Sequence, residues 1–426
     1  MIKAVPPALI FILGALLIPL LRGKLKQICL LVVPAVAFLD IVHLNQGTSW
    51  VYHFLGYELI FCEVDRLSLV VGYIFVIIAF LAMLYSLHIK EDGQHVAAFL
   101  YVGSSLGVVF AGDYFSLFAF WEIMAVASVF LIWYQKDKES LNAGFRYILM
   151  HLFGGCCLLV GIIIYIVSKG SIDVNRLEPG LAYWLVLLGF GLNTGFIPIH
   201  TWLPDAYPEG TVTGSVFLSV FTTKTGVYVL ARCFAGVDFV AYMGGSMAVF
   251  GVLFALLQND ARKLLSYHII SQVGYMVAGV GVGTALSVNG GIAHVFNHIL
   301  YKALLFMCMG SVIYMTGKRK LTEMGGLARF MPITCIACII AALSISGAPG
   351  FNGFVSKGMI ISSAAEVHKP ILELMLILAS VGTFLSFLKL CYYCFFAENT
   401  EIKSKEAPLN MQLAMGLTAV SCVLIG

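Results

Sequence analysis

Three titratable residues recur at a fixed spacing inside a strongly hydrophobic stretch of this sequence. Residues 294–302 read HVFNHILYK, so that His294, His298 and Lys302 are each four positions apart. On a helix this spacing places the three side chains on one face, about 6 Å apart along the axis. Imidazole exchanges protons near neutral pH, and a lysine removed from water can join the same exchange. The pattern favours a proton relay over a metal site, because no cysteine and no second helix with ligand spacing accompanies it.

Further ionisable residues lie within other long apolar runs. They are Glu122, Lys224, Lys357 and Lys389, with His151 as a secondary candidate. Burying a charge in hydrocarbon costs about 3 kcal/mol or more, so such groups usually line a hydrated path or pair with one another. We therefore expect Glu122, Lys224 and Lys357 to be functional. Lys389 stands nearer to the end of its run, where a lysine can instead extend to the membrane surface.

The composition shows where these groups must be placed. Of the 426 residues, 60% are hydrophobic and only 11% are charged, against about 25% charged residues in a typical soluble domain. Too few polar side chains exist to cover a water-soluble surface, so the chain is an integral membrane protein. Its net charge is only +3, and its basic residues are dispersed. These values exclude a collagen, a disordered chain, a disulfide scaffold and a nucleic-acid-binding protein.

Fourteen apolar segments are candidates for crossing a bilayer, which takes about 20 residues. They are residues 4–21, 27–44, 66–88, 94–112, 113–134, 142–168, 180–203, 210–235, 239–260, 262–283, 287–315, 330–366, 371–396 and 408–426. The first begins at Ala4 and is interpreted as a span rather than a cleavable signal. The last reaches Gly426 without a polar stop, so we expect an incomplete C-terminus. The shorter stretch 50–63 alternates and predicts a hairpin outside the membrane.

The positions of the basic residues predict the orientation of these spans. With the N-terminus outside, the cytoplasmic loops hold Arg22, Lys24, Lys26, Lys90, Lys136, Lys138, Arg146, Arg262, Lys263, Lys318, Arg319, Lys320, Arg329, Lys403 and Lys405. The outside segments hold Lys3, Arg66, Lys169, Arg176, Arg232 and Lys369. This asymmetry of fifteen to six follows the positive-inside rule. It predicts a multi-pass protein of the cytoplasmic membrane, with its N-terminus outside.

Two of the predicted helices contain residues that interrupt a helix. The seventh segment reads GFGLNTGFIPIHTWLPDAYPEG, and the twelfth contains SISGAPGFNGFVSKGM. Proline removes a helical hydrogen bond, and paired breaks in two halves are typical of inverted repeats around a polar cavity. Asn193 precedes Lys224 by 31 residues, and Lys357 precedes Lys389 by 32.

These offsets predict an all-α membrane fold built from two inverted five-helix repeats. Residues 1–93 form three flanking spans and the hairpin, 94–235 the first repeat, 239–396 the second, and 408–426 a final span. The pairs Cys335/Cys338 and Cys391/Cys394 have CxxC spacing, but each lies in a long hydrophobic segment. We interpret them as apolar packing residues, so no metal is expected.

Several motifs resemble one family of membrane proteins. They are FWE at 120–122, HTWLPDAYPEGTVTGSVFLSVFTTKTGVY at 200–228, NDARKLLSYHIISQVGYM at 259–276, HVFNHILYKALLF at 294–306 and SGAPGFNGFVSK at 346–357. They resemble the proton-conducting antiporter-like subunits of respiratory complex I, membrane-bound hydrogenases and Mrp-type sodium/proton antiporters. The TTKTGVYVLAR segment and the lysine of GFVSK are most similar to the D-type component of the Mrp group.

The resemblance implies a role for each candidate residue. Glu122 corresponds to the family's glutamate on the fifth helix, and Lys224 to the central lysine on the eighth. The stripe from His294 to Lys302 corresponds to the relay between two half-channels, and Lys357 to the residue that delivers protons outward. The resemblance also implies no cofactor, because redox chemistry belongs to partner subunits. The expected partners are other integral membrane subunits, protons, and Na⁺ in the case of antiport.

One position departs from the family pattern. The family has a lysine nine residues before the tryptophan of HTWLP, where this chain has Asn193. Asparagine can hold water through hydrogen bonds but cannot titrate. Glu122 therefore lacks its usual partner. We expect it to be protonated for part of a transport cycle, or to pair with a cation from another helix or subunit.

Three interpretations of function remain open at this point. The chain is an ion-translocating subunit, moving protons alone or in exchange for sodium. Alternatively, it is a structural subunit that has lost conduction, as Asn193 would suggest, or a pump subunit of a redox-driven hydrogenase or complex I-like enzyme. A lone transporter of a small solute is disfavoured, because no substrate pocket signature is present. The sequence contains no redox or hydrolytic site of its own, so whether the assembly is an enzyme stays open.

Overall fold

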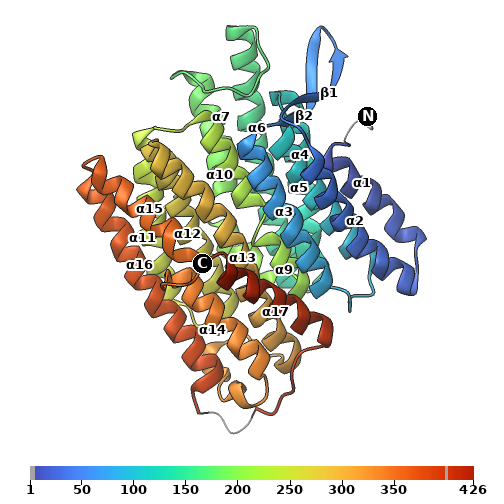
Figure 1. Cartoon of the computed structure of the whole chain (residues 1–426), viewed down its shortest axis with the longest axis vertical. Helices are drawn as coiled ribbons and strands as arrows, with labels where there is room; N and C mark the ends of the chain where they lie inside the picture. The colour runs from blue at the N-terminus through green and yellow to red at the C-terminus, as the bar shows by residue number, and fades with distance from the viewer. Residues whose placement is uncertain (1–4, 399–401) are drawn as a thin grey trace.

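The computed structural model describes residues 5–398 and 402–426 and is almost entirely helical (Figure 1). Lys3 and Ala4, at the predicted start of the first span, lie outside the described residues. The helices are α1 (Pro7–Leu17), α2 (Gly23–His43), α3 (Arg66–Tyr85), α4 (Asp92–Phe110), α5 (Tyr114–Trp133), α6 (Lys138–Lys169), α7 (Leu181–Thr194), α8 (Trp202–Ala206), α9 (Val212–Leu218), α10 (Thr222–Cys233), α11 (Asp238–Leu257), α12 (Ala261–Val282), α13 (Ala285–Thr316), α14 (Pro332–Ser346), α15 (Gly353–Glu366), α16 (Pro370–Cys391) and α17 (Leu409–Leu424). Short turns of 3₁₀ helix occupy Ile18–Leu20, Tyr207–Glu209, Leu321–Glu323 and Leu327–Arg329, and a π turn occupies Tyr392–Phe396.

The helices confirm the predicted all-α membrane fold. In the described part of the chain, nine helical stretches are long and apolar enough to cross a bilayer, counting α9 and α10 as one. Four shorter apolar helices and α12 complete the correspondence with the fourteen predicted segments. The division into two inverted repeats stays a prediction.

The predicted breaks in the seventh and twelfth segments are confirmed. Helix α7 ends at Thr194, and Gly195 follows in the left-handed region with φ +85°. Helix α14 ends at Ser346, and Gly347 follows with φ +76°. A residue with a Cβ would be strained at both positions, because this conformation favours glycine. Asn193 precedes its break, whereas Lys357 follows its own, so the two residues lie on opposite sides of the interruptions.

A third break divides the eighth segment, which the sequence predicted as one helix. Helix α9 ends at Leu218 and α10 begins at Thr222, so the chain leaves the helix at residues 219–221. These residues are Ser, Val and Phe. They include neither glycine nor proline, which is why the pattern gave no indication of the break.

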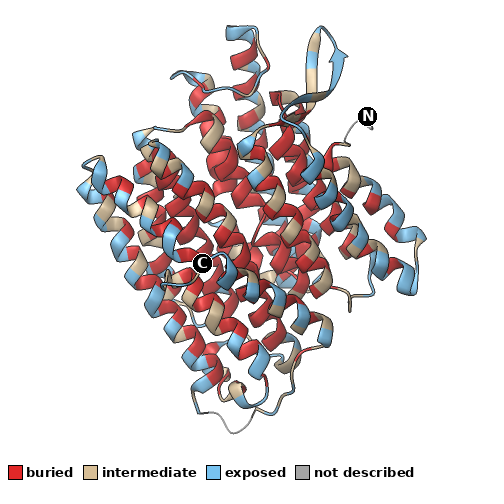
Figure 2. Cartoon of the chain, in the orientation of Figure 1, coloured by how far each residue is buried: buried red, intermediate tan, exposed pale blue. Residues whose placement is uncertain are grey.

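The buried interior lies along α10, α12 and α13 (Figure 2). In the apolar window of Val212–Cys233, 94% of residues are buried inside the protein, against 39% in α6 and 33% in α2. The peripheral helices therefore present apolar side chains outward, as expected of a surface that faces lipid. The polar candidates on α10 and α13 lie in the interior, where they must find partners within the protein or water.

A two-stranded antiparallel hairpin follows α2. Its strands are β1 (Gly47–Phe54) and β2 (Tyr57–Val64), which extend slightly beyond the predicted stretch 50–63. The amide of Ile60 donates to Oδ2 of Asp113, and the amide of Gly112 donates to the Ile60 carbonyl. These bonds attach the hairpin to the connection between α4 and α5.

Glycines allow α11 and α12 to approach each other closely. A Cβ added to Gly251 of α11 would lie 2.5 Å from the backbone nitrogen of Ser271, and one on Gly274 of α12 would lie 2.5 Å from that of Ala248. Small residues at such contacts let helix backbones pack directly, which drives helix association within membranes.

We expect Gly251→Ala to destabilise the protein, because the added Cβ would meet backbone atoms that cannot move aside. Overpacking of this kind costs about 1–3 kcal/mol. The melting temperature of the purified protein in detergent should fall by several degrees. Gly358→Ala on α15 is the matched control, since its Cβ would meet no atom within 4 Å. Equal melting temperatures for the two variants would contradict this packing argument.

Candidate functional site

The predicted stripe on α13 points into the core of the protein. His294, His298 and Lys302 are all fully buried. Nδ1 of His294 lies 2.9 Å from Oγ of Ser356, and Nε2 lies 3.2 Å from Oε1 of Gln272. The sequence therefore placed the three residues correctly on one face, and it did not indicate the polar residues of α12 and α15 that contact them.

Two members of the stripe lack protein partners. Neither ring nitrogen of His298 forms a hydrogen bond within the described structure, and the same holds for Nζ of Lys302. The ring of His298 lies 6.4 Å from that of His294, measured between centroids. Buried polar groups almost always have a partner, which can be an ordered water. We therefore interpret these unpartnered atoms as the walls of a hydrated space.

Lys224 is held at the third break. Its Nζ donates to the carbonyl of Ser219 at 2.6 Å and to Oγ1 of Thr223 at 3.0 Å. Ser219 directly follows α9, so this carbonyl belongs to the end of a helix, where backbone acceptors are left free and the helix dipole is negative. Lys224 also interacts electrostatically with His298 and Lys302, which places it beside the stripe.

Lys357 is held in the same way at the break of the twelfth segment. Its Nζ donates to the carbonyl of Ile345 at 2.6 Å, in the last turn of α14. The ammonium also lies 5.0 Å from the ring centroid of Tyr275, a favourable distance for a cation–π contact. Its neighbour Ser356 contacts His294, so Lys357 is connected to the relay through an adjacent side chain.

His268 belongs to the same cluster, although its sequence position alone did not single it out. It is fully buried on α12, and both of its ring nitrogens lack protein partners in the described structure. It interacts electrostatically with Lys302 and Lys357, so it lies between the two lysines. A histidine in the middle of an apolar helix is the only sequence signal that could have identified it.

Glu122 lies apart from this cluster. It lines a groove of about 440 Å³ between α4 and α5, together with apolar residues such as Val96 and Ile123. Its Oε1 has no hydrogen-bond partner in the described structure and rests against Gly155 of α6, where a Cβ would overlap it. The carboxyl group thus stands between the protein interior and an outward-facing apolar surface.

Asn193 is buried at the end of α7, and neither atom of its amide forms a hydrogen bond with described residues. The next residue, Thr194, packs against Gly226 of α10, two residues beyond Lys224. Asn193 therefore lies on the side of the site where α7 approaches α10. Its unpartnered amide is a second indication of space for water.

A group of buried hydroxyls, absent from the sequence prediction, surrounds the start of α10. The hydroxyl of Tyr101 lies 2.7 Å from Oγ1 of Thr222, and that of Tyr147 lies 2.8 Å from Oγ of Ser128. The predicted candidate His151 stacks on Tyr147 at 4.0 Å between ring centroids. Tyrosine and threonine are common in ordinary helices, so nothing in their spacing identified them.

Lys389 lies away from the cluster. It is half-buried on α16, and its Nζ donates to the carbonyls of Leu256 and Gln258 at 2.8 and 2.9 Å. These carbonyls end α11, so Lys389 closes the terminus of a neighbouring helix. The geometry fits the alternative of a lysine that extends toward the end of its span.

The two CxxC pairs lie together in the structure. Cys338 of α14 contacts both Cys308 of α13 and Cys391 of α16 through its thiol. All eleven cysteines are free. In the described parts of the chain, no group of three or more His, Cys, Asp or Glu residues is arranged to hold a metal ion.

Comparisons with known proteins agree with this fold and site. Residues 111–386 match the family model described as the transmembrane region of NADH:quinone oxidoreductase and Mrp antiporters. An uncharacterized protein of Methanocaldococcus jannaschii is 32% identical over 76% of this chain and 72% of its own length. The D component of the Na⁺/H⁺ antiporter of Alkalihalophilus pseudofirmus is 31% identical over 68% of this chain, which covers only 63% of that relative.

A solved structure agrees over nearly the full length. The archaeal membrane-bound sulfane sulfur reductase, a respiratory membrane complex, contains a chain that is 28% identical with a TM-score of 0.91. The match covers 99% of this chain and 75% of that one. The protein is thus a multi-pass member of the NADH:quinone oxidoreductase/Mrp antiporter family of membrane subunits.

Proposed function

We propose that this chain is an ion-translocating subunit that moves protons along the buried cluster from Lys224 to Lys357. The observation that carries the proposal is a connected set of titratable side chains with unpartnered nitrogens in the interior of a membrane protein. Proton hopping requires groups that titrate and water that joins them. The cluster offers the groups, and its unpartnered atoms mark where water would be bound.

The order of the groups follows from their contacts. Protons reach Lys224, pass by way of Lys302 and His298 to His294, and continue through Ser356 to Lys357. Each of the two terminal lysines rests against a free helix carbonyl, which stabilises its charged form. Losing a proton to water would release the lysine from that carbonyl. The buried hydroxyls near Tyr101 and Thr222 lie at the Lys224 end, where they would help to conduct protons inward.

The family membership supports the setting in which this transport occurs. The similar proteins belong to multi-subunit membrane complexes, so we place this chain among other integral membrane subunits. One relative is described as an Na⁺/H⁺ antiporter component, and exchange for sodium is the form of transport that its name supports. The distribution of basic residues supports a cytoplasmic membrane location with the N-terminus outside.

Asn193 favours a second candidate function, a structural subunit that no longer conducts. An asparagine at the position of the family's lysine cannot carry a proton. The two functions differ in what they require of Lys224 and Lys357. A structural subunit needs only their packing, whereas a conducting subunit needs their titration.

The first prediction separates these functions. In everted membrane vesicles that contain the complete complex, Lys224→Met and Lys357→Met should each lower proton translocation by about 100-fold. Methionine keeps much of the length of lysine but cannot titrate. Lys318→Met, which removes an exposed lysine outside the cluster, should leave the rate unchanged. Wild-type rates in correctly folded Lys224→Met and Lys357→Met complexes would favour the structural role.

The second prediction concerns the protonated state of Glu122. A hydrophobic carbodiimide reacts with protonated carboxyl groups that it reaches from an apolar phase, and Glu122 lines an outward-facing apolar groove. We expect peptide mass spectrometry to detect its modification. Gly155→Ala should increase the rate several-fold, because its Cβ would displace the carboxyl group toward the groove.

The control for this experiment is Gly416→Ala on α17, where a Cβ would meet no atom within 4 Å. Its modification rate should equal that of the wild type. A Glu122 side chain that stays unmodified, or that reacts equally fast in Gly155→Ala, would argue against a carboxyl group poised between core and groove.

The third prediction tests the missing cation. Asn193→Lys would restore the family's usual residue beside the carboxyl-bearing half of the site. An ion-paired carboxylate is not protonated, so carbodiimide modification of Glu122 should fall and coupled transport should change. Asn193→Gln, which adds length without charge, is the control. Unchanged modification of Glu122 in Asn193→Lys would contradict the proposed relation between the two positions.

A further inference from the structure

A polar pocket far from the titratable cluster opens where α2 begins and α3 ends. Its volume is about 540 Å³, and it is lined by residues of both helices and by Asp92 at the start of α4. Three of the lining side chains are basic, namely Arg22, Lys26 and Lys90. This differs from the other large grooves of the protein, whose walls are almost entirely apolar.

The charges in this pocket do not cancel. Lys26 is largely buried, and its Nζ binds Oδ1 of Asp92 at 2.7 Å and the carbonyl of Lys90 at 2.9 Å. This leaves Asp92 occupied. In the described chain, neither Arg22 nor Lys90 forms an ion pair, and both are exposed at the mouth of the pocket. The pocket therefore keeps two free cations and offers no free anion, which suits a phosphate and excludes a quaternary ammonium.

An apolar groove continues from the pocket along the same helices. It is lined by Pro34 and Phe38 of α2, Ile77 and Phe80 of α3, and Leu417 of α17, with a volume of about 540 Å³. In α2, Pro34 and Phe38 follow the pocket residue Gln27 by seven and eleven positions, a spacing that keeps them on one helix face. Seven residues of helix span about 10 Å.

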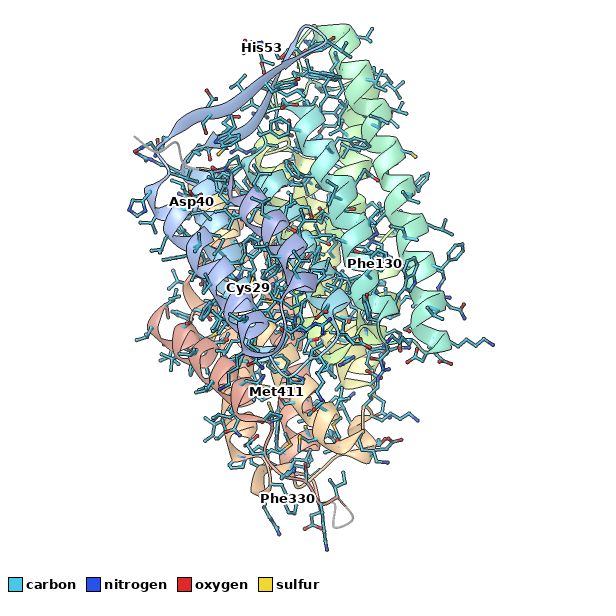
Figure 3. The ribbon with its side chains drawn as sticks, turned by 90° about the vertical axis from the view of Figure 1, so that its right-hand side faces the viewer. Cys29, Asp40, His53, Phe130, Phe330 and Met411 are labelled. Carbon is cyan, nitrogen blue, oxygen red and sulfur yellow. The ribbon has the colours of Figure 1, made fainter. Side chains whose placement is uncertain are left out.

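Helix α17 connects the two cavities independently. Nδ2 of Asn410 lies 3.3 Å from Nδ1 of His88, which lines the pocket, and Leu417 and Val420 line the groove. Figure 3 looks onto this side of the molecule, with Cys29 of α2 and Met411 of α17 labelled near its centre. Phe38, Leu417 and Val420 are exposed, so the groove is open to the surroundings of the bundle.

We propose that this paired site binds one anionic phospholipid, with its phosphate headgroup in the pocket and an acyl chain in the groove. The site would lie at the membrane surface where the positive-inside rule places Arg22, Lys26 and Lys90, so the lipid belongs to the cytoplasmic leaflet. A free phosphate ion would satisfy the pocket but not the groove. The bound lipid would fill the space that α2, α3 and α17 leave between them.

The test measures lipid retention on the intact protein with its complex. Native mass spectrometry follows release from detergent that contains phosphatidylglycerol or phosphatidylcholine, and a parallel sample contains inorganic phosphate. We expect the wild type to retain phosphatidylglycerol about tenfold better than phosphatidylcholine. The double variant Arg22→Gln/Lys90→Gln should lose that preference. Lys138→Gln, which removes an exposed lysine elsewhere on the same predicted side, should keep it.

A groove variant distinguishes the lipid from free phosphate. Ala35→Trp would fill the groove without changing charge, so it should reduce retention of phosphatidylglycerol several-fold. All altered residues are exposed, and melting temperatures in lipid-free detergent verify folding. Equal retention of both lipids by the wild type would overturn the proposal, as would an unchanged preference in the double variant. Full retention in Ala35→Trp, with phosphate competing equally well, would identify a phosphate site and also overturn it.

Discussion

The central physical interaction of this protein is the contact between a buried lysine and the carbonyl end of an interrupted helix. An ammonium group in the membrane interior is tolerated only if dipoles replace the water it has lost. Lys224 finds the carbonyl of Ser219, and Lys357 finds that of Ile345. In both cases the break in the helix creates the acceptor that the lysine uses. The interruptions are therefore the means by which charge enters the core.

This arrangement explains why the region between the two lysines can remain incompletely bonded. A static core would satisfy its buried nitrogens with protein acceptors, since each unpartnered group costs free energy. Within the described structure, His298, Lys302 and His268 all keep unpartnered nitrogens, while His294 is fixed by Ser356 and Gln272. Fixed contacts at some positions and free ones at others are suited to groups that exchange protons with water between them.

The sequence predicted the parts of this site that have a periodic or disruptive signature. The four-residue spacing placed His294, His298 and Lys302 on one face, and glycine and proline indicated the breaks after α7 and α14. The break at residues 219–221 was missed because serine, valine and phenylalanine do not by themselves end a helix. Tyr101 and Tyr147 were also missed, because only tertiary packing brings their hydroxyls together. The same packing joins cysteines that lie more than fifty residues apart in the chain.

The two halves of the site differ in how they are held. At the far end, a lysine, a serine and a histidine form a continuous set of contacts across α13 and α15. On the side of α7, Asn193 offers an amide without partners among the described residues, and Glu122 stands in a separate groove. A half with no cation of its own can transfer protons only through water and neutral groups, so its conductance depends on hydration rather than on an ion pair. The step between Glu122 and Lys224 is therefore where changes in a neighbouring subunit would have the greatest effect on transport.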